Sequence, residues 1–119
     1  MRSRQERLSA YLESGLRAHA QGDVGAAAAA YRQALGVAPD DAHALNLMGV
    51  ALLQLGQPEQ AVDCLQRAAR RLRDNADVLG NLAQAHFALG HYETARAAFR
   101  KASRLDPRQV QFQLGAANS

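Results

Sequence analysis

The chain repeats itself with a spacing of 34 residues, and this constrains its fold more than any other feature. The match runs through four columns: Gly22, Gly56 and Gly90; Ala27, Ala61 and Ala95; Tyr31, Leu65 and Phe99; and Ala34, Ala68 and Ala102. A period of about 20 to 50 residues is typical of chains that stack one supersecondary unit on the next. We therefore divide the single domain 1–119 into units 8–41, 42–75 and 76–109. Residues 110–119 are expected to be a partial fourth unit or an incomplete cap.

Each unit has the pattern of a helix, a tight turn and a second helix. A glycine such as Gly56 can adopt the left-handed conformation that ends a helix, and Pro58 suits the first turn of the next one. This pattern predicts an all-α chain. Helices are expected near 7–20, 24–36, 41–54, 58–71, 75–88 and 92–104, and 109–116 begins a short seventh.

Small residues recur where the two helices of a unit should meet. Gly15, Gly49 and Ala83 occupy one column of the first helices. We expect them to face the alanines Ala27, Ala61 and Ala95 of the second helices, so that small residues on both sides let the helix axes approach closely. The large side chains Tyr31, Leu65 and Phe99 should then fill the space between successive units.

The combined pattern resembles the tetratricopeptide repeat, whose signature reads W-x2-L-G-x2-Y, then A-x3-F, then P. The resemblance covers residues 8 to 109. In the third unit it rests on Leu79, Leu82, Ala83, His86, Gly90, Tyr92, Ala95, Phe99, Ala102 and Pro107, and in the second on Leu45, Met48, Gly49, Leu52, Gly56, Ala61, Leu65 and Ala68. Arg73 replaces the family's proline, and no unit has the tryptophan. The resemblance implies a right-handed α-α superhelix, a solenoid whose first helices line a concave groove.

The helical period selects the positions that would line such a groove. They are Leu12, Leu16, His43, Asn46, Val50, Leu53, Asp77, Asn81, Gln84 and Phe87, with His19, Gln54 and Gly80 beside them. If exposed, the apolar members suit an amphipathic helix or an extended apolar peptide. The alternative is that Leu16 and Leu53 only pack against neighbouring units. Asn46 and Asn81 could pair with a peptide backbone, because an amide offers both a donor and an acceptor.

Similar repeats are known for a clamp that holds the carboxylates of heat-shock chaperone tails with lysines and asparagines. By alignment with that family, the slots of the clamp fall on Leu12, Leu16, Leu47, Asp77 and Asn81. Only Asn81 could serve, so the resemblance does not extend to chaperone tails.

Residues in catalytic or metal-binding spacing are not found. None of the four histidines pairs with another at i, i+4, and the chain has no H-E-x-x-H, C-x-x-C or glycine-rich phosphate loop. Cys64 falls in the column of Ala30 and Ala98, which indicates a packing role for its side chain. We expect no catalytic residue, no metal and no cofactor, and hence no enzyme within this chain.

Charge and hydropathy exclude further classes of partner. The net charge is only +3. We interpret the cations of the second helices as a solvated face without interleaved aromatic residues. They are Arg67, Arg70, Arg71, Arg73, Arg96, Arg100 and Arg104, with Lys101. We expect no nucleic acid and no membrane partner. One cysteine permits the cytoplasm, and the excess of arginine over lysine suggests a GC-rich bacterial genome.

The sequence therefore predicts a non-catalytic scaffold that binds a protein or peptide in its groove. Two alternatives stay open. The chain could be the amino-terminal recruiting module of a larger enzyme, such as a glycosyltransferase, sulfotransferase or oxygenase. It could also self-assemble as a homo-oligomer through an exposed C-terminal stacking face, which Phe112 and Leu114 would cover only in part.

Overall fold

The computed structural model describes residues 3–107, and within this range the chain forms six helices and no strand. They are α1 (Arg4–Ala20), α2 (Val24–Val37), α3 (Ala42–Gln54), α4 (Pro58–Arg71), α5 (Ala76–Ala88) and α6 (Tyr92–Leu105). The predicted all-α fold is confirmed. The expected fourth unit or cap over 110–119 lies outside the described residues.

The largest difference from the expected helix bounds is at the start of α1, which begins at Arg4 instead of residue 7. A capping box explains the extra turn. The Ser3 hydroxyl accepts a hydrogen bond from the Glu6 amide at 3.1 Å, and the Glu6 carboxylate accepts one from the Ser3 amide at 3.3 Å. These two bonds satisfy amides that a helix start otherwise leaves unpaired.

The three glycine turns have the same geometry. Gly22, Gly56 and Gly90 have φ values of 82°, 77° and 82°, a region that other residues rarely adopt. After each glycine, the next amide donates to the carbonyl five residues earlier: Asp23 to Ala18, Gln57 to Leu52 and His91 to His86, at 2.9, 2.9 and 2.8 Å. This is the Schellman ending of a helix, and it places the two bonded residues side by side.

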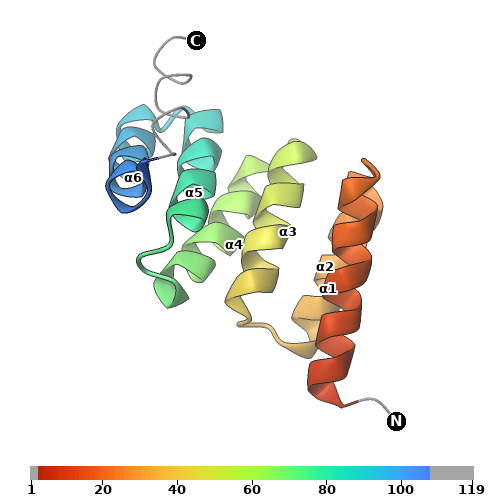
Figure 1. Ribbon diagram of the computed structural model, residues 1–119. Helices are drawn as coiled ribbons and strands as arrows, with labels where there is room; N and C mark the ends of the chain where they lie inside the picture. The colour runs from red at the N-terminus through yellow and green to blue at the C-terminus, as the bar shows by residue number, and fades with distance from the viewer. Residues whose placement is uncertain (1–2, 108–119) are drawn as a thin grey trace.

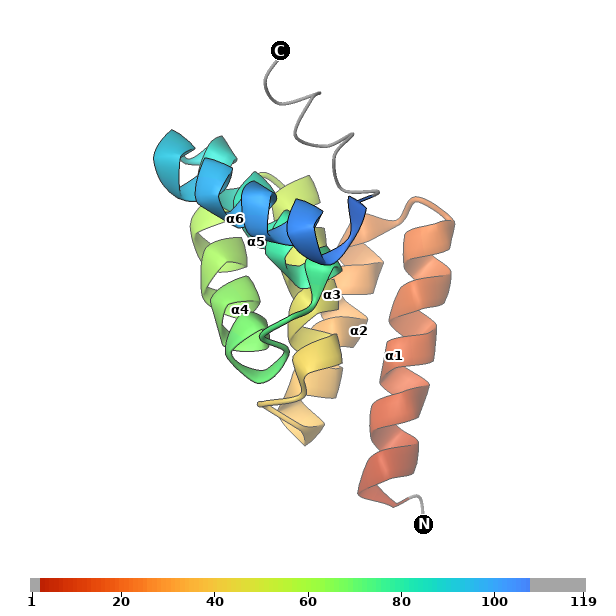
Figure 2. The same ribbon diagram turned by 60° about the vertical axis from the view of Figure 1, so that its left-hand side comes forward.

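The buried apolar residues form several clusters, and the largest of them has members on α2, α3, α4 and α5. This main cluster includes Tyr31 of α2, Met48 of α3, Leu65 of α4 and Ala85 of α5. Figure 1 shows the helix pairs following one another from α1 and α2 at one end to α5 and α6 at the other, and Figure 2 shows them turned by 60° with α5 and α6 brought forward. Each helix packs extensively on the next one in sequence, and α3 also contacts α5.

The closest helix contacts differ from the expected pairing of small residues with small residues. A Cβ added to Gly15 would overlap the ring of Tyr31, and one added to Gly49 would lie 2.5 Å from Cγ of Leu65. Gly15 and Gly49 therefore make room for a large side chain of the second helix, while Ala27 and Ala61 are not the groups that fill this space. In the third pair, Ala83 shares a small cluster with Ala95 and Phe99.

In the part of the chain that the structure describes, no helix is both long and apolar enough to cross a membrane.

Candidate functional site on the first helices

All ten predicted groove positions lie on the first helices of the three pairs, and we call this set of residues the first-helix face. It consists of the predicted groove positions Leu12 and Leu16 on α1; His43, Asn46, Val50 and Leu53 on α3; and Asp77, Asn81, Gln84 and Phe87 on α5. Hydrogen bonds join neighbouring helices across it. Nε2 of His19 on α1 contacts Oε1 of Gln54 on α3, and Nδ2 of Asn81 on α5 donates to Oδ1 of Asn46 on α3 at 3.0 Å.

Exposure differs along this face. Leu16 and Phe87 are 44% and 41% exposed, which is high for large apolar side chains. His43 and Asp77 are also exposed, while the remaining six residues are half-buried. Leu12 and Leu53 pack against the main core cluster. The packing alternative therefore applies in part to Leu53, whereas Leu16 is presented to solvent.

Asn46 and Asn81 bond to each other, although the sequence pointed to a peptide backbone as their partner. Their bond uses the carbonyl of Asn46 and one N–H of Asn81. An amide side chain has two donors and an acceptor oxygen, so the amide nitrogen of Asn46 and the carbonyl of Asn81 keep hydrogen-bonding capacity. The pair is thus a polar position of the first-helix face that joins α3 to α5.

His19 links the face to the core. Its Nδ1 lies 3.0 Å from the hydroxyl of Tyr31, which is fully buried, and its Nε2 contacts Gln54. A neutral imidazole protonated at Nε2 satisfies both contacts, because Tyr31 then donates and Gln54 accepts. Burial raises the pKa of Tyr31 above its ordinary value, so the phenol keeps its proton. His19 is thus engaged in holding α1, α2 and α3 together.

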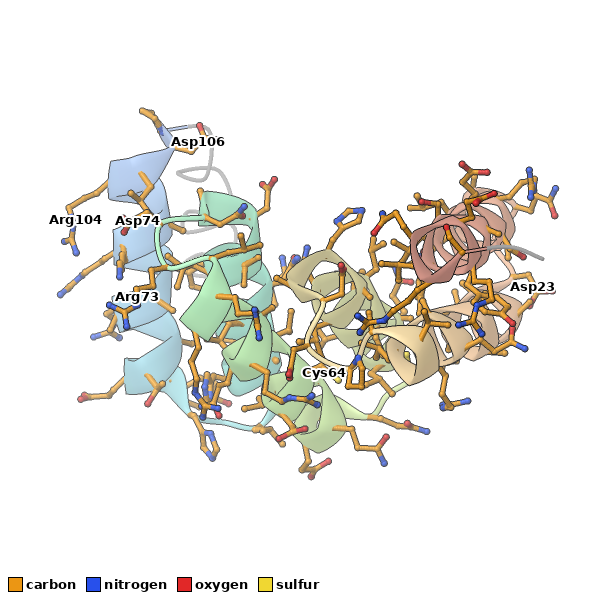
Figure 3. The ribbon with its side chains drawn as sticks, turned by 90° about the horizontal axis from the view of Figure 1, so that it is seen from below. Asp23, Cys64, Arg73, Asp74, Arg104 and Asp106 are labelled. Atoms are coloured by element: carbon orange, nitrogen blue, oxygen red, sulfur yellow. The ribbon has the colours of Figure 1, made fainter. Side chains whose placement is uncertain are left out.

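Two arginines of α4, the second helix of its pair, contact the turn between α2 and α3. Arg67 donates to the carbonyl of Pro39 at 2.9 Å and lies 3.6 Å from the Asp40 carboxylate, and Arg71 lies 3.7 Å from the same carboxylate. These contacts hold the turn between α2 and α3. Asp63, four residues before Arg67 on α4, also pairs with it, at 3.9 Å. Figure 3 shows Arg73 and Arg104 at the α5 and α6 end of the molecule, far from Asp23.

Sequence reasoning missed a contact between two histidines. Nδ1 of His86 lies 3.1 Å from Nδ1 of His91, and the ring centroids are 5.4 Å apart. Burial, and then the neighbouring His91, lower the pKa of His86 below its ordinary value. The signal was present in the sequence, because a helix-ending glycine at Gly90 brings residues 86 and 91 together. A search at i, i+4 could not find it. Among residues 3–107, no group of three or more His, Cys, Asp or Glu is arranged to hold a metal ion.

Cys64 is half-buried on α4 and packs against the core (Figure 3). Burial and the negative charge of Asp63 raise the pKa of its thiol, against a smaller opposing effect of Arg67. Since the thiolate is the reactive form, we expect iodoacetamide to alkylate Cys64 more slowly in the folded chain than in urea at the same pH. Intact-mass measurements over time test this. Asp63→Asn should increase the folded rate, and equal rates in both states would contradict the assignment.

The family model described as tetratricopeptide repeat matches residues 12–76, 47–110 and 80–119. None of the curated proteins matches the chain by sequence. Among solved structures, the Arabidopsis OM64 TPR domain has a TM-score of 0.89 at 21% identity, covering 98% of each chain. The first TPR of Spaghetti (RPAP3), bound to the HSP90 peptide SRMEEVD, has a TM-score of 0.86 at 17% identity, covering 94% of this chain and 91% of that one.

A third similar structure is a mutant O-GlcNAc transferase from Thermobaculum terrenum, with a TM-score of 0.84 and 28% identity. The match covers 90% of this chain but only 21% of the transferase chain. The family model matches most of the sequence, and the fold has the same 34-residue period, with six paired helices and three glycine turns. This chain therefore belongs to the tetratricopeptide repeat family.

Proposed function

We propose that this protein is a non-catalytic interaction module whose first-helix face binds an apolar segment of a partner protein. The observation that carries the proposal is the exposure of Leu16 on α1 and of Phe87 on α5. Hydrogen bonds join both helices to α3, on which Val50 is half-buried. Large exposed apolar side chains on one surface are typical of protein-binding sites.

The polar members of the face support an extended or helical segment as the ligand. Asn46 and Asn81 offer an amide donor and a carbonyl acceptor beside the apolar residues, which suits the backbone of a bound peptide. The solved relative from Spaghetti carries an acidic HSP90 peptide. The ten residues of the first-helix face include neither lysine nor arginine, so we propose a ligand held by apolar contact instead of by its carboxylates.

A peptide-display experiment tests this function. We expect the immobilised chain to select apolar peptides from a random library, with affinities that change little between low and high salt, because apolar contacts are not screened. The peptide SRMEEVD, tested by fluorescence polarisation, should not bind saturably. Selection of acidic peptides, or binding lost at raised salt, would contradict the proposal.

Matched variants locate the site. Leu16→Glu and Phe87→Glu should each weaken the selected peptides by about tenfold or more, as for a central apolar contact in an interface. Leu55→Glu is the control, because Leu55 is 42% exposed and ends α3 at the turn, outside the first-helix face. Equal losses in all three variants would place binding elsewhere, provided that circular dichroism shows unchanged helicity.

A second proposal is that the chain recruits substrates or partners for an enzyme encoded with it. Its support is the similarity to the Thermobaculum O-GlcNAc transferase, of which the chain matches about a fifth. The genomic reading frame around residues 1 and 119 tests this directly. A catalytic domain in the same frame supports the proposal, and its absence rejects it.

A further inference from the structure

We infer that His86 and His91 form a two-ligand site for a late first-row divalent metal ion, such as Zn²⁺ or Cu²⁺. The inference rests on their geometry in the α5–α6 turn and is independent of the proposed peptide binding. His86 belongs to the last turn of α5, and His91 is the residue immediately before α6.

The distance between the two Nδ1 atoms suits a shared metal ion. Imidazole nitrogens bind Zn²⁺ at about 2.0 to 2.1 Å, so two of them on one ion, at angles between square and tetrahedral, lie about 2.9 to 3.3 Å apart. The observed separation of 3.1 Å falls within this range. Without metal, the same separation is a hydrogen bond in which one ring donates. With metal, both rings carry their proton on Nε2 and present Nδ1 to the ion.

The backbone fixes this arrangement before any ion binds. In a Schellman ending, the residue after the left-handed glycine lies against the residue five positions earlier, and apolar contacts are common there. The His91 amide donates to the His86 carbonyl at 2.8 Å, as the equivalent amides do in the other two turns. The equivalent side chains are Ala18 with Asp23 and Leu52 with Gln57. Only the third of these described turns carries two metal-ligating side chains.

One ligand of the pair is buried and the other is accessible. His86 is 8% exposed, so the surrounding core restricts the orientation of its imidazole. His91 is exposed, so an ion can approach from its side of the turn. Two protein ligands leave the remaining coordination positions to water, which makes this an open site.

Calorimetric titration of the chain 1–119, without an affinity tag and after treatment with a chelator, tests the site. We expect one Zn²⁺ or Cu²⁺ per chain, with Cu²⁺ bound more tightly, as the Irving–Williams order requires. Each ion should also raise the melting temperature, because the unfolded chain lacks the preformed pair. Absence of saturable binding by either ion at millimolar concentration would overturn the inference.

The second repeat supplies variants that the fold already accommodates. His86→Leu and His91→Gln reproduce the side chains of Leu52 and Gln57 in the equivalent turn. Each should weaken metal binding by at least about tenfold, since even outer-shell partners of metal ligands contribute 10- to 100-fold. His43→Gln changes an exposed histidine on α3 and should leave binding unchanged. Wild-type affinity in His91→Gln, or equal loss in His43→Gln, would assign the ion to another site.

Discussion

Gly49→Ala is expected to destabilise the protein by about 1 to 3 kcal/mol, although alanine is the better helix former. The added Cβ would lie 2.5 Å from Cγ of Leu65, whose side chain is fully buried within the main core cluster. The α3 and α4 helices must therefore separate or Leu65 must leave its rotamer. Urea unfolding, monitored by circular dichroism, measures the change in the free energy of unfolding.

Gly36→Ala is the matched control. This glycine is also helical, near the end of α2, but a Cβ there would meet no described atom within 4 Å. Removing the flexibility of glycine at an unstrained helical position stabilises a protein by about 0.4 to 1 kcal/mol. The two substitutions should thus change the free energy of unfolding in opposite directions. If both stabilise, the close contact between α3 and α4 is not tight enough to limit the side chain at position 49.

Leu65→Ala is expected to have the largest effect, a loss of about 2 to 5 kcal/mol. Leu65 is 0% exposed and belongs to the core cluster that joins the helix pairs, so its truncation removes buried apolar surface and leaves a cavity. Such a loss is a large part of the 5 to 15 kcal/mol that is typical for a small protein. Leu55→Ala, at a 42% exposed position, should change stability far less.

The double variant Gly49→Ala with Leu65→Ala distinguishes contact from general damage. Truncating Leu65 creates space for the new Cβ at position 49, so the combined loss should be smaller than the sum of the two single losses. Additive losses would indicate that the two residues do not share one contact.

The helices were predictable because their signals are local. Gly56 ends one helix and Pro58 starts the next whatever lies elsewhere in the chain, and both signals are read directly from the sequence. The apolar repeat does not predict the start of α1 at Arg4, because this start depends on the capping pair of Ser3 with Glu6, which precedes the first repeat unit. The repeat spacing also identified Gly15 and Gly49 as contact positions.

The partners of side chains were harder to predict, since they depend on how helices far apart in sequence face each other. Periodicity predicted that Gly49 faces α4. It did not predict whether Ala61 or Leu65 fills the space beside this glycine. It placed Asn46 and Asn81 on one face, but only the approach of α3 to α5 brings their amides within 3.0 Å. The positions of the candidate site follow from the helical period. Which of them bind a partner stays a prediction.

The succession of helix contacts has a consequence for how the chain acquires its structure. Apart from the contact of α3 with α5, the extensive contacts join helices that are consecutive in sequence, so most loops that must close during folding are short. Chains with such low contact order fold rapidly, typically in microseconds to milliseconds. During synthesis on the ribosome, each helix emerges directly after the helix on which it packs. A newly emerged pair can therefore pack on the preceding pair before later segments are made.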